Sequence, residues 1–85
     1  MSEDPIQRAI DVKARHEADL MRKANVLSVG VGYRETRGRP TDEIVLVVSV
    51  TQKVPRSKLP PQDIVPPVIE GIPVDVREAG TMWAL

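Results

Sequence analysis

Cysteine and phenylalanine are absent from this 85-residue chain, and tyrosine and tryptophan occur once each. Without cysteine the chain has no disulfide, no thiolate metal ligand and no cysteine nucleophile. An excess of one charge is also missing, because twelve basic residues balance twelve acidic ones and the formal net charge is zero. A nucleic-acid-binding domain usually has a clear basic excess, so the composition argues against a nucleic-acid partner.

Long apolar runs are missing as well. No stretch approaches the roughly 18 apolar residues of a membrane-spanning helix. The first five residues, MSEDP, lack the basic start and apolar stretch of a signal peptide. We therefore expect a cytoplasmic protein with no membrane partner.

Valine and isoleucine dominate the apolar residues, which make up 41 % of the chain. A core of β-branched residues favours a sheet over a helical bundle. The length is sufficient for one hydrophobic core, because unaided folding needs roughly 40 residues. We predict a single α+β domain that covers residues 1–85.

Residues 5–24 have the pattern of an amphipathic helix. Asp4 is suited to cap the free backbone amides, Pro5 to the first helical position and Gln7 to the capping box. Asn25 is a plausible stop. The apolar residues recur at spacings of three and four, so we predict that they form the buried stripe: Ile6, Ile10, Ala14, Ala18 and Met21, widened by Ala9 and Leu20.

Three strands are predicted, at about residues 26–34, 43–51 and 72–78. In the first, the small residues Ser28, Gly30 and Gly32 share one face, which a closely packed helix would explain. A polar loop over residues 34–42 is expected to join the first two strands. In the third, Pro73 predicts an edge position or pairing on one side only.

The second predicted strand is apolar on both faces, which is typical of a strand covered on both sides. A helix on a small, mainly antiparallel sheet of three to four strands forms a two-layer sandwich, and it covers one face only. The other face could be covered by the proline-rich connection of residues 53–67, with one short helical turn within residues 57–64, or by a second copy of the chain.

A search for catalytic chemistry finds no complete site. Gly30 and Gly32 lack the third glycine and the following helix of a dinucleotide fingerprint. His16, the single histidine, has no serine on an exposed elbow to activate, since the candidates are Ser28, Ser49 and Ser57. The acidic residues are scattered through turns without metal-ligand spacing. We predict a non-enzyme with no cofactor and no metal.

Six basic residues fall in two loops, which lie at opposite ends of an antiparallel pair: Arg34, Arg37 and Arg39 in one, and Lys53, Arg56 and Lys58 in the other. They would form two separate basic spots rather than one stripe with stacking aromatic residues. Solubilising charge is the preferred interpretation, with contact to phosphate or to an acidic partner as the alternative.

Four segments in order resemble a known domain. They read NVLSVGVGY at residues 25–33, GRPTDEIVLVVSV at 38–50, KVPRSKLP at 53–60 and IEGIPVDV at 69–76. The chain is similar to the N-terminal domain that precedes a trypsin-like serine peptidase domain in bacterial proteins similar to plant NARROW LEAF 1. In that family the catalytic residues lie downstream, so no position here corresponds to one. The resemblance implies oligomer formation.

The leading hypothesis is a non-catalytic assembly domain that forms a homo-oligomer. The candidate interface residues are Tyr33, Val45, Val47, Met82 and Trp83. Two alternatives stay open: a fragment or regulator that acts with a serine peptidase, and a small nucleic-acid-binding protein that uses the basic loops.

Overall fold

The computed structural model describes residues 4–79, and the first element is helix α1, Pro5–Met21. The side chain of Asp4 accepts a hydrogen bond from the backbone N–H of Ile6 at 2.9 Å, and Pro5 occupies the first turn, as predicted. The helix ends three residues before the predicted Ala24. The backbone N–H of Ala24 donates to the Asp63 carboxylate at 3.0 Å, outside the helical pattern, and the preceding two N–H groups bond three residues back.

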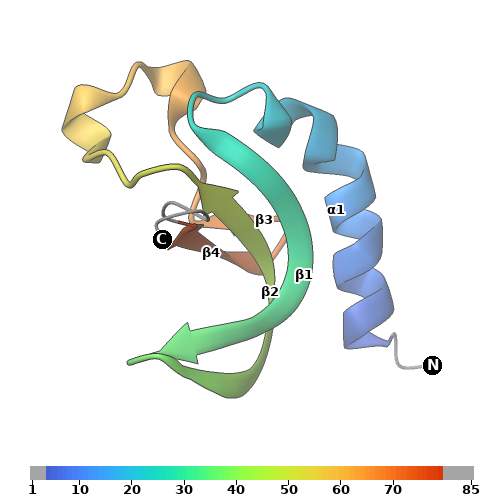
Figure 1. Ribbon diagram of the computed structural model, residues 1–85. Coiled ribbons are helices and arrows are strands. Elements are labelled where there is room, and N and C mark those ends of the chain that lie inside the picture. The colour runs from blue at the N-terminus through green and yellow to red at the C-terminus, as the bar shows by residue number, and fades with distance from the viewer. Residues whose placement is uncertain (1–3, 80–85) are drawn as a thin grey trace.

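Strands β1, Val26–Thr36, and β2, Arg39–Val50, form a long antiparallel hairpin. Figure 1 shows that they bend together as an arc, with α1 alongside β1. The predicted polar loop over residues 34–42 is wrong, because only Arg37 and Gly38 separate the strands. Both have positive φ, 54° and 77°. This conformation matches the twist of the flanking strands and permits a two-residue turn.

The sheet is completed by β3, Val68–Ile69, and β4, Ile72–Glu78, in the order β1-β2-β4-β3. Two of the three strand pairings are antiparallel, and β2 pairs with β4 in parallel. The predicted edge position for this strand is wrong, because β4 lies between β2 and β3 and pairs with both. Pro73 itself pairs only with Val68 of β3, since the pairing with β2 begins at Val74. The fold is α+β: one helix on a four-stranded mixed sheet.

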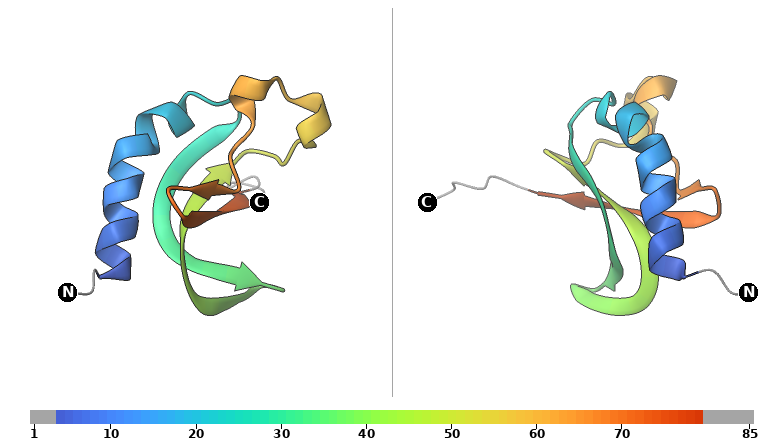
Figure 2. Two further views of the ribbon diagram at one scale, coloured as in Figure 1. Left: turned by 180° about the vertical axis from the view of Figure 1, so that it is seen from behind. Right: turned by 90° about the vertical axis from the view of Figure 1, so that its right-hand side faces the viewer.

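The proline-rich connection carries the chain from the end of β2 to β3, as a parallel pairing requires a crossover. It contains two 3₁₀ turns, Arg56–Lys58 and Pro61–Asp63, where one turn was predicted. Figure 2 shows this connection beside the C-terminal end of α1. Lys23 Nζ donates to the carbonyl oxygen of Gln62 at 2.8 Å, which ties the two segments together.

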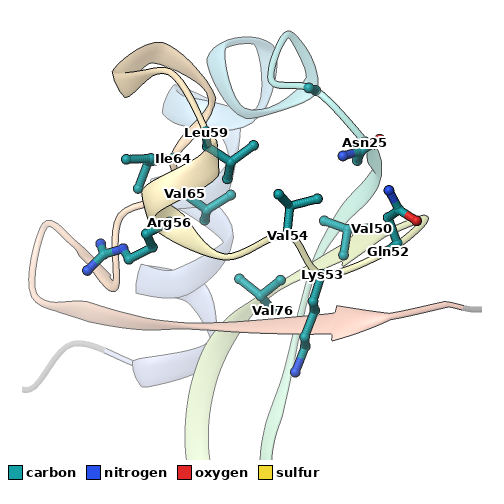
Figure 3. Close-up of a pocket in the computed structure, with 11 residues that line it drawn as sticks. Asn25, Val50, Gln52, Lys53, Val54, Arg56, Leu59, Ile64, Val65 and Val76 are labelled. Carbon is teal, nitrogen blue, oxygen red and sulfur yellow. The ribbon is translucent and has the colours of Figure 1, made fainter.

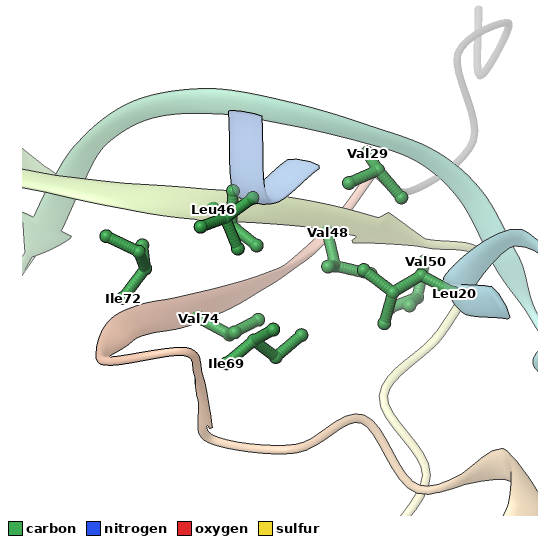
Figure 4. Close-up of a cluster of buried hydrophobic side chains, with 9 residues drawn as sticks. Leu20, Val29, Leu46, Val48, Val50, Ile69, Ile72 and Val74 are labelled. Atoms are coloured by element: carbon green, nitrogen blue, oxygen red, sulfur yellow. The ribbon is translucent and has the colours of Figure 1, made fainter. Parts of the chain in front are cut away.

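The core lies between α1 and one face of the sheet. Val12 and Leu20 of the helix belong to one buried cluster with residues from all four strands (Figure 4): Val29, Leu46, Val48, Val50, Ile69, Ile72 and Val74. Ala9 is also fully buried. Of the predicted helix stripe, Ala9 and Leu20 are buried as predicted, whereas Ile6, Ile10 and Met21 are exposed. The stripe is therefore wrong in rotation, because the buried side is centred on Ala9, Val12 and Leu20.

The glycines of β1 are not explained by close helix packing. Gly30 pairs with Val47 and Gly32 with Val45, so both glycines lie on the face opposite the one that carries Val29. A Cβ added to Gly30 would meet nothing within 4 Å, and one added to Gly32 would meet Val47 at 3.2 Å. The expectation of a helix across this face is wrong.

Candidate interaction surfaces

Charged side chains of β4 extend over the face of β2 that points away from α1. Val47 pairs with Asp75 of β4, so Asp75 and Arg77 share the face of Val45 and Val47. Because β2 lies between β1 and β4, any contact from β4 to β1 must pass over it. The backbone N–H of Glu35 in β1 donates to Asp75 Oδ2 at 3.2 Å.

Arg77 reinforces this crossing. Its guanidinium donates to the carbonyl oxygen of Tyr33, lies 3.7 Å from the Glu35 carboxylate and binds Asp75 at 3.1 Å. Val45 is consequently 0 % exposed and Val47 is half-buried. The prediction that Val45 belongs to an intermolecular interface is wrong. Asp75 and Arg77 of β4 thus extend over the apolar face that was expected to need a second copy or the proline-rich connection as its cover.

A cluster around Glu70 joins α1 to the β3–β4 turn. Arg15 donates two hydrogen bonds to the Glu70 carboxylate, at 2.8 and 3.0 Å, and His16 Nε2 lies 2.7 Å from it. Arg8 donates to the Glu70 carbonyl oxygen at 2.6 Å. The hydrogen bonds from Arg15 and then His16 lower the pKa of Glu70 from 4.5 to about 2. His16 thus contacts a carboxylate that fastens the helix to the sheet.

The six basic candidates form two groups at opposite ends of the β1–β2 hairpin, as predicted (Figure 1). At the turn end Arg34 binds the Glu43 carboxylate at 2.6 Å, so part of that group's charge is compensated. Arg37 and Arg39 are exposed beside it. At the other end, Lys53 and Arg56 flank an apolar hollow, and Lys58 lies exposed in the adjoining 3₁₀ turn.

This hollow has a volume of about 280 Å³ and lies between the end of β2 and the proline-rich connection. Figure 3 shows Val54, Leu59, Val65 and Val76 gathered around it, while the charged ends of Lys53 and Arg56 extend outward. Its apolar lining suits an apolar side chain or ring. Sequence patterns did not reveal it, because its residues come from β2, β4 and an irregular connection.

A stripe of exposed apolar residues runs along α1. Ile6, Ile10 and Met21 are 45 %, 43 % and 42 % exposed, and Ala14 lies between them on the same side. On the neighbouring strand, Leu27 and Tyr33 are each 47 % exposed. Tyr33 is thus accessible, as an interface candidate must be. Met82 and Trp83 lie outside the described residues.

Within residues 4–79, no three His, Asp or Glu side chains are placed to hold a metal ion. In the same range, α1 is neither long enough nor apolar enough to cross a membrane. The chain matches no known family and none of the curated proteins with which it was compared.

Proposed function

We propose that this chain is a non-catalytic assembly domain in which two copies meet through the exposed stripe of α1 and the adjoining edge strand β1. The observation that carries the proposal is the exposure of Ile6, Ile10 and Met21, each more than 40 %. Single exposed apolar residues are ordinary on a protein surface, but a contiguous apolar patch is typical of an interaction site.

The stripe lies on the side of α1 that adjoins β1. Arg8, Arg15 and His16 reach the β3–β4 turn, so one side of the helix faces β3 and β4. With about 3.6 residues per turn, Ile6, Ile10 and Met21 project from the other flank of the helix. The buried Val12 and Leu20 lie between this flank and the one that carries Arg8 and Arg15. Since β1 is the other edge of the sheet, the stripe and the β1 edge lie on the same side of the molecule.

A second copy is the partner that this surface fits best. An edge strand presents free backbone groups that an identical strand can pair with in antiparallel register about a two-fold axis. Lys13 and Glu17, beside the stripe, form an ion pair with each other at 3.2 Å, so neither side chain leaves an uncompensated charge next to the proposed contact. The small Ala14 lets two helices approach closely, and the zero net charge of the chain does not oppose self-association.

The surface area that a stable dimer buries requires contributions from both α1 and β1. A stable interface buries roughly 800 Å² on each partner. One face of a helix roughly 25 Å long and 10 Å wide offers about a third of that area. The helix stripe alone is therefore too small, and residues of β1, including Leu27 and Tyr33, must contribute.

Size-exclusion chromatography with light scattering tests the proposal. The wild-type chain should elute as a species heavier than the 9.4 kDa monomer. Ile10→Glu places a charge in the stripe at a position that tolerates glutamate in a helix, and it should convert this species to monomer with an unchanged circular dichroism spectrum. Val68→Glu is the matched control, because Val68 is 54 % exposed but lies on β3.

A monomeric wild-type chain at high micromolar concentration would remove the homo-oligomer. The domain would then need a different partner. The resemblance to domains that precede trypsin-like peptidases makes a serine peptidase domain the first partner to mix with it, with loss of binding in Ile10→Glu as the expected sign of the same surface.

A further inference from the structure

We propose that the apolar hollow beside the proline-rich connection binds a small monocarboxylate, whose hydrocarbon part occupies the hollow while its carboxylate contacts Lys53 and Arg56. The site is formed within one chain, at the end of the β1–β2 hairpin away from the Arg37–Gly38 turn. Such binding does not require self-association through α1 and β1.

The interior of the hollow is aliphatic and large enough for a short hydrocarbon. A dry cavity of about 150 Å³ lined by aliphatic side chains accommodates benzene. With a volume of about 280 Å³, the hollow has room for a six-carbon chain or ring. Its apolar walls come from β2, β4 and the connection: Val50, Val54, Leu59, Ile64, Val65 and Val76.

Hydrogen bonds fix the walls of the hollow relative to one another. The backbone N–H of Ala24 donates to the Asp63 carboxylate at 3.0 Å, which ties the connection to the segment that follows α1. The backbone N–H of Lys53 donates to the Glu78 carboxylate at 2.9 Å, which ties the start of the connection to β4. Largely pre-formed pockets of this kind are typical of small-molecule sites.

Two cationic side chains at the mouth of the hollow are available to an anion. The charged ends of Lys53 and Arg56 extend outward from it (Figure 3). Neither charged group forms an ion pair or hydrogen bond with any residue in the range 4–79. The nearby Glu78 is bonded to the Lys53 backbone and does not line the hollow. A carboxylate would therefore find uncompensated positive charge beside an apolar space, where charge-assisted hydrogen bonds are strong.

The dimensions favour a small molecule over a protein partner. A stable protein interface buries roughly 800 Å² on each side, whereas a hollow of about 280 Å³ encloses one short chain or ring. Asn25 and Gln52 also line it and supply the few polar groups that orient a ligand in an otherwise apolar pocket. The positive charge at the mouth selects a carboxylate over an amine or a neutral molecule.

Titration with hexanoate, followed by amide chemical shifts in two-dimensional NMR, tests this site. Hexanoate should shift, in a saturable manner, the amide signals of residues that line the hollow, including Val54, Leu59 and Val76. 1-Hexanol has a chain of the same length without the charge and should bind several-fold more weakly. Hexylammonium should bind most weakly of the three, because it meets charge of its own sign.

Two substitutions of the same kind locate the charge contact. Arg56→Gln should weaken hexanoate binding roughly two- to fivefold, the range of an exposed ion pair. It should leave 1-hexanol binding unchanged, which also shows that the variant is folded. Lys58→Gln is the matched control, because it removes a charge from the same 3₁₀ turn but lies outside the hollow. It should leave the binding of both ligands unchanged.

The comparison of ligands in the wild-type chain is decisive without any variant. Equal affinity for hexanoate and 1-hexanol would overturn the proposal, as would hexanoate shifts confined to residues outside the hollow. Binding of an acidic peptide at the hollow without any response to hexanoate would also overturn it, because the hollow would then serve a protein partner. Charge-selective binding that persists in Ile10→Glu would support it even if self-association fails.

Discussion

Glu70 is the residue through which side chains of α1 are hydrogen-bonded to the β3–β4 turn. Its carboxylate accepts hydrogen bonds from Arg15 and contacts His16, while its carbonyl oxygen accepts from Arg8. The residue lies in a two-residue turn with φ of 50°, followed by Gly71 with φ of 81°. This turn geometry directs the acidic side chain toward α1, so a local backbone conformation determines a long-range contact.

The pH dependence of stability should report this contact. The pKa of Glu70 is lowered from 4.5 to about 2 by the hydrogen bonds from Arg15 and His16. A group whose pKa is lower in the folded chain stabilises the fold above its unfolded value, and this contribution is lost as pH falls. We expect the urea midpoint to decrease between pH 4.5 and about pH 2, and Glu70→Gln to lack that part of the decrease. Parallel curves for the two chains would contradict the account.

A substitution at Val45 tests whether the face of β2 that points away from α1 is covered within a single chain. Because its side chain is 0 % exposed, Val45→Ala should lower the free energy of unfolding by about 2 kcal/mol, from lost apolar burial and a small cavity. The mass measured by light scattering should not change. A variant with wild-type stability and a lower mass would instead place Val45 in an intermolecular interface.

At the scale of elements, two glycines of the β1–β2 hairpin are expected to have opposite effects on stability. Gly38 has φ of 77° in the turn, whereas Gly30 lies within β1, and a Cβ at either position would meet nothing within 4 Å. The two sites therefore differ in backbone conformation and not in available space.

This difference predicts opposite effects of alanine. Gly38→Ala should destabilise the chain by about 1 kcal/mol, because a left-handed conformation is strained for a residue with a Cβ. Gly30→Ala should stabilise it by roughly 0.5 kcal/mol, because alanine restricts the unfolded chain without strain in the folded one. Thermal unfolding of both variants checks the pair, and equal effects would show that φ is not the deciding factor.

The helix illustrates what periodicity can and cannot predict. Its start was predictable from Asp4 and Pro5, which act locally. Its buried side was not, because α1 carries two apolar series with the same spacing, one through Ile6 and Ile10 and one through Ala9 and Val12. Only the sheet that it meets, with its ion pairs to the β3–β4 turn, selects between them.

At the scale of the molecule, the α+β class and the apolar central strand followed from composition and alternation along the chain. The closure of the second face did not, because Asp75 and Arg77 bind β1 across β2 from about forty residues away in sequence. Nothing in the local pattern of β4 distinguishes these two residues from solvated charges. The hollow was equally hidden, since it exists only where three separated segments meet.

The surface left for assembly is therefore a different one from that predicted. The central strand is enclosed within one chain, and the exposed apolar side chains lie on α1 and β1. The same apolar helix residues that the sequence assigned to the core now form the candidate contact between copies. Association would bury them in the dimer rather than in the monomer.

Sedimentation of the wild-type chain over a dilution series measures this association. We expect a mass near twice 9.4 kDa at high concentration, falling toward the monomer value on dilution. The Ile10→Glu variant should have the monomer mass at every concentration. A wild-type mass of 9.4 kDa throughout the series, or a dimer that Ile10→Glu leaves intact, would contradict it.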